Sequence, residues 1–318
     1  MWEKFKGNGV FVFSDPAGAK ACLALNEILN IEQVVGNRKL YTNKEYAFYK
    51  QFECDVKIIR IEKIGCITEE FDWIFTGTSH PDSSNRFELL MLKSVIAKNS
   101  FSFIDHWTNF KLRFTFNDKL ILPTVIFVVD EKAKELAIAD GLPEKDLFIF
   151  ENPYLIYLKK YKQSNISRNV FCKTLDILIT NKIILYAPDP LSLRSTNKRD
   201  EVTVLKELIN ICKNKFTLLL KLHPLQPLTE INKIINENSF LKLMNDNLFL
   251  PQDVFKNADC IIGFYSNYLL EASVINKNII RYLLKGNQID YLAESLGSNS
   301  IAVNNENELK LAINKINA

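Results

Sequence analysis

The chain has 318 residues, a formal net charge of +3, 47% hydrophobic residues and 24% charged residues. This length exceeds a usual single hydrophobic core, so we expect two domains. Basic and acidic residues nearly balance, which argues against nucleic acid as the main partner.

Cysteine usage and motif content exclude several further classes. None of the six cysteines forms a CxxC pair, and several lie in apolar runs, which is typical of buried thiols in a reducing compartment rather than a metal or disulfide framework. The sequence contains neither GxGxxG nor GxxxxGK[ST], so dinucleotide and P-loop sites are not expected. No signal-like N-terminus and no apolar run of membrane-spanning length is present, and we expect a cytoplasmic protein.

The first half of the chain alternates short apolar runs with helical patterns. Strands are predicted at 9–14, 39–42, 56–61, 73–76, 101–104, 124–129 and 148–150, and helices at 19–30, 85–98 and 131–140. Residues 151–182 carry no clear motif and fit a helical linker. We therefore place an N-terminal domain at 1–165 and a C-terminal domain at 166–318.

The alternation restarts in the second half. Strands are predicted at 182–187, 216–222, 240–244 and 278–282, together with an apolar run of strand length that ends at 263. Helices are predicted at 201–213, 228–236, 251–257 and 306–316, together with one that begins just past 266 or 267. Two such blocks predict an α/β protein with two Rossmann-like, doubly wound domains. Ligands bind beyond the carboxyl ends of the strands in such sheets, and we expect the two domains to face each other across a cleft.

One group of candidate residues follows the strand that ends at Gly263. Tyr265, Ser266 and Asn267 come next, at the predicted start of a helix whose first amides can bind phosphate. Glu271 lies on the same face of this helix within an apolar segment, and its carboxylate can accept hydrogen bonds from sugar hydroxyls. The alternative is a capped helix whose acid only complements the helix dipole.

Two other loops of the second half carry candidates for phosphate contact. His223-Pro224 follows an apolar strand, and the proline fixes the exit of the chain, so the imidazole can donate a hydrogen bond to a phosphate. Ser192 and Arg194 lie on the first loop of the second domain and can also meet a phosphate. A plain turn at the end of a strand is the alternative for His223.

The segments ILYAPDP, LLLKLHP, ADCIIGFYSNYLLEA and NKNIIRY resemble, in this order, the donor domain of a GT-B glycosyltransferase. The second half of the chain is most similar to bacterial capsule and lipopolysaccharide enzymes, including sialyl- and Kdo-transferase-like groups with a lysine/glycine-x-His-Pro motif. CDP-glycerol glycerophosphotransferases share this layout, and non-hydrolysing UDP-GlcNAc 2-epimerases have a similar fold and comparable motifs. The first half matches mainly in architecture.

This resemblance implies a metal-independent, inverting transfer from a nucleotide sugar of the CMP, CDP or UDP type to a surface-polysaccharide or glycolipid acceptor, without a cofactor. His223 and Ser266 would contact the nucleotide phosphates, and Glu271 a ribose or the donor sugar. Peripheral contact with the inner membrane or with assembly enzymes is a further expectation. Three alternatives stay open: a UDP-GlcNAc 2-epimerase, a CDP-alditol phosphotransferase, and a non-catalytic nucleotide-sugar-binding subunit.

A transferase of this kind needs a base that deprotonates the acceptor hydroxyl, and we expect it in the first half. Asp15 follows the first strand, and Gly18 lets a substrate approach the backbone. Asp105-His106, at another strand end, is the competing pair. Glu88, in the helix after the loop at 77–79, is the third candidate.

Further residues of the first half are predicted to line the substrate site. Trp107 can stack on a sugar ring or pack in the core, and Arg113 lies close to it in the sequence. Ser79 belongs to a loop of small and polar residues after a strand. Asp15 and Asp105 can each serve instead as turn or cap residues.

Overall fold

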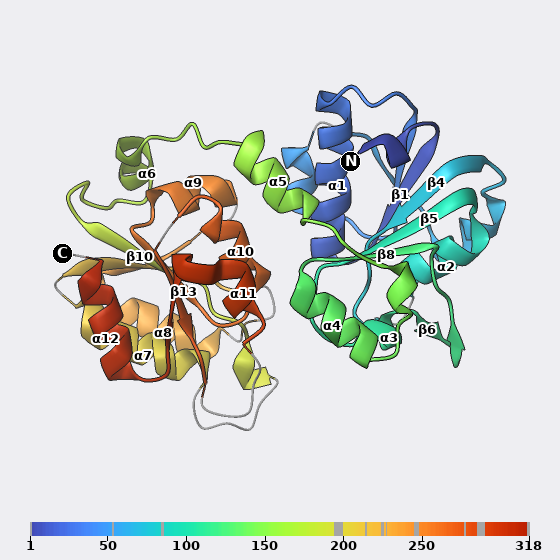
Figure 1. Cartoon of the computed structure of the whole chain (residues 1–318). Helices are drawn as coiled ribbons and strands as arrows, with labels where there is room; N and C mark the ends of the chain where they lie inside the picture. Colours follow the sequence, from blue (N-terminus) through green and yellow to red (C-terminus); the bar gives the residue numbers. More distant parts are fainter. Residues whose placement is uncertain are drawn as a thin grey trace. The chain divides into compact units, whose positions relative to one another are not determined.

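A computed structural model of the chain describes residues 2–52, 54–83, 86–193, 200–213, 215–223, 226, 228–244, 248–276, 278–284 and 290–316. The chain divides into two compact units, Met1–Tyr157 and Leu158–Ala318. Each unit contains one parallel β-sheet with helices (Figure 1). No helix in the described ranges combines the length and the apolar character needed to cross a membrane.

The Met1–Tyr157 unit is built on a seven-stranded parallel sheet with the order β3-β2-β1-β4-β5-β8-β9. Its strands are β1 (Gly9–Phe13), β2 (Arg38–Thr42), β3 (Val56–Ile58), β4 (Glu70–Thr76), β5 (Ile96–Ile104), β8 (Val125–Val128) and β9 (Leu147–Ile149). The helices are α1 (Pro16–Ile31), α2 (Phe87–Ser94), α3 (Phe110–Arg113), α4 (Glu131–Ala139) and α5 (Pro153–Lys160), the last of which continues into the second unit. A small antiparallel hairpin pairs β6 (Thr115–Phe116) with β7 (Lys119–Leu120).

The first strand is buried along its whole length because both faces of the sheet are covered. Val10 and Val12 pack on one face in a cluster with Phe87 and Met91 of α2. On the other face, Phe11 belongs to an aromatic group joined by edge-to-face contacts. Side chains that alternate along this strand therefore pack into the hydrophobic cores on both faces of the sheet.

The predicted helix at 85–98 is wrong in extent. The helix α2 runs over Phe87–Ser94, and β5 starts as early as Ile96. Residues 96–100 pair with β4, and the β-branched Val95 and Ile96 favour extended backbone over helix. The apolar residues of the helix and of the following strand merge into one run, which hid the boundary from the sequence pattern.

The Leu158–Ala318 unit repeats the architecture with six parallel strands in the order β12-β11-β10-β13-β14-β15. These are β10 (Lys182–Tyr186), β11 (Phe216–Leu220), β12 (Leu241–Leu243), β13 (Cys260–Gly263), β14 (Ile279–Tyr282) and β15 (Ser300–Val303). Its helices are α6 (Arg168–Thr174), α7 (Glu201–Cys212), α8 (Thr229–Glu237), α9 (Pro251–Asn257), α10 (Asn267–Ser273), α11 (Leu292–Leu296) and α12 (Glu306–Lys315). Figure 1 shows α7, α8 and α12 on one face of this sheet and α9, α10 and α11 on the other.

The strand order reverses direction at one point in each sheet. In the first unit the chain leaves β1 toward β2 and β3 and returns on the other side with β4; in the second unit β10 and β13 have the same relation. Side chains beyond the carboxyl ends of such a strand pair line a crevice where ligands bind in open α/β sheets. The prediction of two Rossmann-like, doubly wound domains is confirmed, and each has a defined edge where a site is expected.

Candidate functional site

The β1 and β4 loops of the first unit approach each other closely at the point where the strand order reverses. A Cβ atom built on Gly77 would lie 2.8 Å from the Cα of Gly18, and one built on Gly18 would lie 3.0 Å from the Cα of Gly77. Any side chain at either position would push the loops apart. The glycines therefore bring the start of α1 against the loop that follows β4.

Asp15 occupies the centre of this edge. It is the N-cap of α1, and its Oδ1 accepts a hydrogen bond from the backbone N–H of Ala17 at 3.0 Å. Burial and the nearby charge of Asp105 raise the pKa of Asp15 to about 6, although Ala17, Arg113 and His80 act in the opposite direction. The carboxyl group can therefore be populated in both protonation states near neutral pH.

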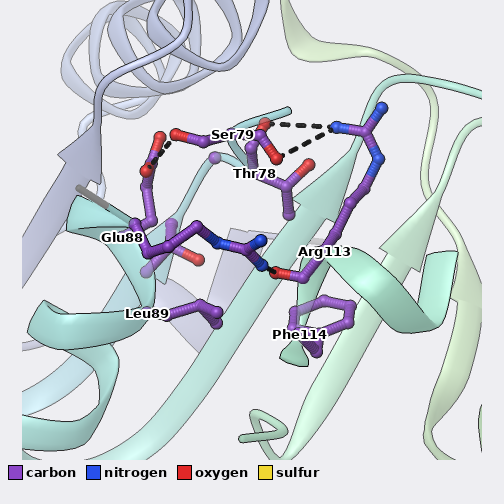
Figure 2. Close-up of a pocket in the computed structure, with 9 residues that line it drawn as sticks. Thr78, Ser79, Glu88, Leu89, Arg113 and Phe114 are labelled. Atoms are coloured by element: carbon purple, nitrogen blue, oxygen red, sulfur yellow. Dashed lines mark hydrogen bonds between the residues drawn. The ribbon is translucent and has the colours of Figure 1, made fainter. Parts of the chain in front are cut away.

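Glu88 of α2 fixes the two loops around Asp15. Its Oε1 accepts hydrogen bonds from the backbone N–H groups of Ser14 at 2.8 Å and Asp15 at 3.4 Å, and its Oε2 accepts one from Ser79 Oγ at 2.5 Å. Figure 2 shows Glu88 and Ser79 pointing toward each other. Burial raises the pKa of Glu88, and its side chain is enclosed. Its contacts are those of a residue that holds Asp15 in place.

Two buried arginines donate hydrogen bonds to backbone carbonyl oxygens in and near the loop after β4. Arg113 donates through Nη1 to the carbonyl oxygens of Thr78 at 3.5 Å and Ser79 at 3.4 Å (Figure 2). Arg86, which the sequence reasoning missed, donates through Nη2 to the carbonyl oxygen of Arg113 at 2.5 Å and through Nη1 to that of Pro81 at 2.9 Å. Both guanidinium groups line a small pocket together with Glu88. Of the two, Arg113 lowers the pKa of Asp15 through its charge.

The loop after β5 supplies the remaining candidates of this unit. Asp105 is buried, with an exposed fraction of 5%, and its charge acts on Asp15, whereas His106 is exposed. Trp107 is 3% exposed, and its indole N–H donates to both carboxylate oxygens of Asp130 at 3.0 Å. The ring of Trp107 therefore packs inside the unit. Asp15 and Asp105 are the pair that this edge brings together.

In the second unit, the edge beyond β10 and β13 is organised by Asp189. Its Oδ2 accepts a hydrogen bond from the backbone N–H of Tyr265 at 3.1 Å, which joins the loop after β10 to the loop after β13. A Cβ on Gly263 would lie 2.9 Å from the carbonyl oxygen of Ala187, so these two strand ends also need a glycine to come together. The sequence reasoning assigned Asp189 no such role.

The predicted phosphate-binding residues of this unit lie around that junction. Ser266 is the N-cap of α10, and its Oγ accepts a hydrogen bond from the N–H of Tyr268 at 3.2 Å. Asn267 begins the helix, and Glu271 is 7% exposed on its buried side. His223 is half-buried directly after β11. Ser266, Asn267 and Glu271 follow β13, and His223 follows β11; these two strands flank β10 in the sheet.

The three other predicted residues of this unit have different outcomes. Ser192 is held by the carboxylate of Glu201, which accepts hydrogen bonds from its backbone N–H at 2.8 Å and from its Oγ at 2.5 Å. Pro224 and Arg194 lie outside the described residues. Within the described ranges, no group of three or more His, Cys, Asp or Glu side chains is arranged to hold a metal ion.

No protein-family model and no curated protein matches the sequence. Solved structures do match over nearly the whole chain. UDP-GlcNAc 2-epimerase from Methanocaldococcus jannaschii, solved with UDP-GlcNAc and UDP, is 15% identical, with 97% of this chain and 92% of that chain covered and a TM-score of 0.68. A putative UDP-N-acetylglucosamine 2-epimerase from Listeria monocytogenes is 12% identical, with coverages of 98% and 88% and a TM-score of 0.71. A glycosyltransferase from Rickettsia africae is 14% identical, with coverages of 98% and 88% and a TM-score of 0.61.

Identities at this level show a shared fold. The chain therefore has the GT-B-like architecture of two Rossmann-like domains, as the sequence resemblance implied. The same neighbours include both epimerases and a glycosyltransferase, so the fold by itself fits either reaction.

Proposed function

We propose that the protein is an enzyme that acts on a nucleotide-diphosphate sugar and that Asp15 is its acid–base group. The observation that carries this proposal is the half-buried carboxyl of Asp15, whose pKa is raised to about 6, at the edge where the strand order reverses between β1 and β4. An acid–base catalyst works best with a pKa near the operating pH, and ligands of doubly wound sheets bind at this edge.

The second unit is proposed to hold the nucleotide. Ser266 and His223 would contact the phosphates, and Glu271 would accept hydrogen bonds from ribose or sugar hydroxyls. Support comes from their position beyond the ends of β13 and β11, the two strands on either side of β10, and from the fold neighbour solved with UDP-GlcNAc and UDP. We therefore take a uridine diphosphate sugar as the first substrate to test, with CMP and CDP compounds as the comparison.

Epimerisation at C2 of the sugar is the first candidate reaction. Inverting this centre requires that a proton leave C2 and that a proton return to the opposite face. The electron pair freed at C2 forms a C1–C2 double bond as the nucleotide diphosphate leaves C1, and the diphosphate adds back to C1 when C2 is reprotonated. A carboxyl with a pKa of about 6, with Asp105 beside it, is present in both its acid and its base form near neutral pH, which suits such a two-way proton transfer. The epimerases among the fold neighbours favour the same reaction.

Sugar transfer is the second candidate. The Rickettsia africae neighbour is named a glycosyltransferase, and Asp15 as a base would take the proton of an acceptor hydroxyl while the nucleotide diphosphate leaves. This reaction needs a glycan or glycolipid acceptor, whereas the epimerase needs UDP-GlcNAc alone. The two candidates can therefore be separated by leaving the acceptor out.

The deciding experiment incubates the purified protein with UDP-GlcNAc in D2O and follows C2 by proton NMR. An epimerase incorporates deuterium at C2 and forms UDP-ManNAc without an acceptor. We expect Asp15→Asn to slow this exchange by about 10²–10⁴-fold, while the exposed Asp55→Asn control stays close to the parent.

A transferase instead shows no exchange and releases UDP only when an acceptor is added. A thermal-shift screen with UDP, UDP-GlcNAc, CDP and CMP tests binding independently of turnover. Absence of any stabilisation at millimolar ligand would overturn the proposal for both reactions.

A further inference from the structure

We infer that Glu201 is a positioning residue for the nucleotide site of the second unit. It is the first residue of α7, and it is 1% exposed. The inference rests on the proposed nucleotide binding at this sheet edge. Its subject is a side chain that contacts two loops and that neither the sequence motifs nor the family resemblance singled out.

The carboxylate of Glu201 joins the loop after β10 to the loop after β11. Its Oε2 accepts from the backbone N–H of Ser192 at 2.8 Å, and its Oε1 accepts from Ser192 Oγ at 2.5 Å. The same Oε1 accepts from Gln226 Nε2 at 2.5 Å. Three donors from two separate segments thus converge on one buried carboxylate.

Gln226 connects this carboxylate to the proposed phosphate ligand. Its backbone N–H donates to the carbonyl oxygen of His223, in the loop after β11, at 2.9 Å. The side chain of Gln226 is also buried, with an exposed fraction of 6%. A displacement of Gln226 would therefore act on the backbone of His223 through this hydrogen bond.

The base of α7 is itself fixed to the sheet. The hydroxyl of Tyr186, the last residue of β10, donates to the carbonyl oxygen of Glu201 at 2.9 Å. Asp200 caps the helix by accepting from the N–H of Thr203 at 2.8 Å. The backbone of Glu201 is therefore held in place, and its carboxylate can in turn hold the two loops. Pre-organised loops of this kind reduce the ordering cost of binding a ligand.

Only a carboxylate satisfies all three donors. A glutamine in its place offers only one acceptor oxygen. Its amide NH2 group would then face either the backbone N–H of Ser192 or the two side-chain donors, Ser192 Oγ and Gln226 Nε2. Glutamine has nearly the same size as glutamate, so the change alters hydrogen bonding with little change in packing. This makes Glu201→Gln a selective probe of the link between the two loops.

The matched control is Glu207→Gln on the same helix. Glu207 is 9% exposed and accepts a hydrogen bond from the hydroxyl of Tyr282, in β14, at 3.0 Å. Both variants remove one buried carboxylate from α7 by the same isosteric change. A general loss of stability would affect the two alike, whereas a positioning role predicts that only Glu201→Gln weakens nucleotide binding.

The experiment measures the Kd of the full chain for UDP by calorimetry and kcat at saturating UDP-GlcNAc. We expect Glu201→Gln to raise Kd by about tenfold, the loss of one net hydrogen bond, and to leave kcat within about threefold. Glu207→Gln should bind UDP within about twofold of the parent. Equal Kd values for the two variants would overturn the inference.

Amide hydrogen exchange gives a second readout that needs no ligand. In Glu201→Gln, peptides covering Ser192 and His223 should exchange faster than in Glu207→Gln, and unchanged exchange in both peptides would also refute the inference. Gln226→Leu provides a milder variant in case Glu201→Gln does not fold, and it should accelerate exchange at His223. If the parent binds no UDP, the proposed function fails, while the exchange data still decide whether Glu201 holds the loops.

Discussion

Replacing Asp15 by asparagine should stabilise the protein at neutral pH and leave its stability at pH 4 almost unchanged. The pKa of Asp15 is about 6 in the folded protein, against an ordinary value of 3.8. Well below pH 3.8 the carboxyl is protonated in both the folded and the unfolded states, and at pH 4 only the first part of the difference between them has developed. Between these two pKa values the unfolded chain ionises first, so folding stability falls as pH rises toward 6 and then stays low.

The size of this effect follows from the two pKa values. At 1.36 kcal/mol per pKa unit, the folded protein loses about 3 kcal/mol across this interval. Asparagine cannot ionise, and its Oδ1 can still accept from the N–H of Ala17 and cap α1. Asp15→Asn should therefore gain up to about 3 kcal/mol at pH 7.5.

Urea unfolding of the parent and of Asp15→Asn at pH 4 and pH 7.5 measures this difference. The exposed Asp55→Asn variant is the control, and it should show no pH-dependent gain. The same Asp15→Asn protein should be inactive in the proposed reaction, because stability is then gained at the expense of an acid–base group. An identical difference in stability between parent and variant at the two pH values would refute the assignment of a raised pKa to Asp15.

Two further variants test the same edge of the first unit. Asp105→Asn removes a negative charge that raises the pKa of Asp15, so the acid limb of the pH–rate profile should move to lower pH; an unmoved limb would show that Asp15 does not control it. Gly77→Ala places a Cβ 2.8 Å from the Cα of Gly18 and should destabilise the protein by about 1–3 kcal/mol in urea unfolding, whereas Gly65→Ala meets no atom within 4 Å and should be nearly neutral.

The fold could be predicted from the sequence because buried parallel strands leave continuous apolar runs that polar loops interrupt. The stretch that ends at Gly263 shows this: the strand, the Ser266 cap and the helix from Asn267 all lie where the pattern places them. The strand β15 (Ser300–Val303) was missed because its apolar run is only three residues long; at the edge of its sheet, only Val303 is buried. The order of the strands in each sheet, which determines the edge where a site is expected, could not be predicted from the sequence and is known from the structure.

The candidate site was predictable to a lesser degree. Residues directly after strands, such as Asp15 and Asp105, were accessible because topology places them at one edge whatever their neighbours are. The role of Glu88 could not be predicted. The sequence pattern of a helix does not tell whether an acid on it faces a substrate or accepts hydrogen bonds from loops, as Glu88 does from Ser14 and Ser79. Arg86 gave no signal, since its partners are backbone carbonyl groups, which any residue supplies.

The two units meet the same structural problem in the same way. Loops beyond parallel strands carry unpaired N–H groups and have no ladder to hold them, so something else must fix their positions. In the first unit Glu88 accepts from the loops after β1 and β4, and in the second unit Glu201 accepts from the loops after β10 and β11. Each acid comes from a helix, whereas Asp15 and His223, the residues that we propose to contact the substrate, follow strands. Acids of this kind should therefore be assigned by the number of backbone and hydroxyl donors they accept, and a loss of activity on their removal should be attributed to displaced loops before chemistry.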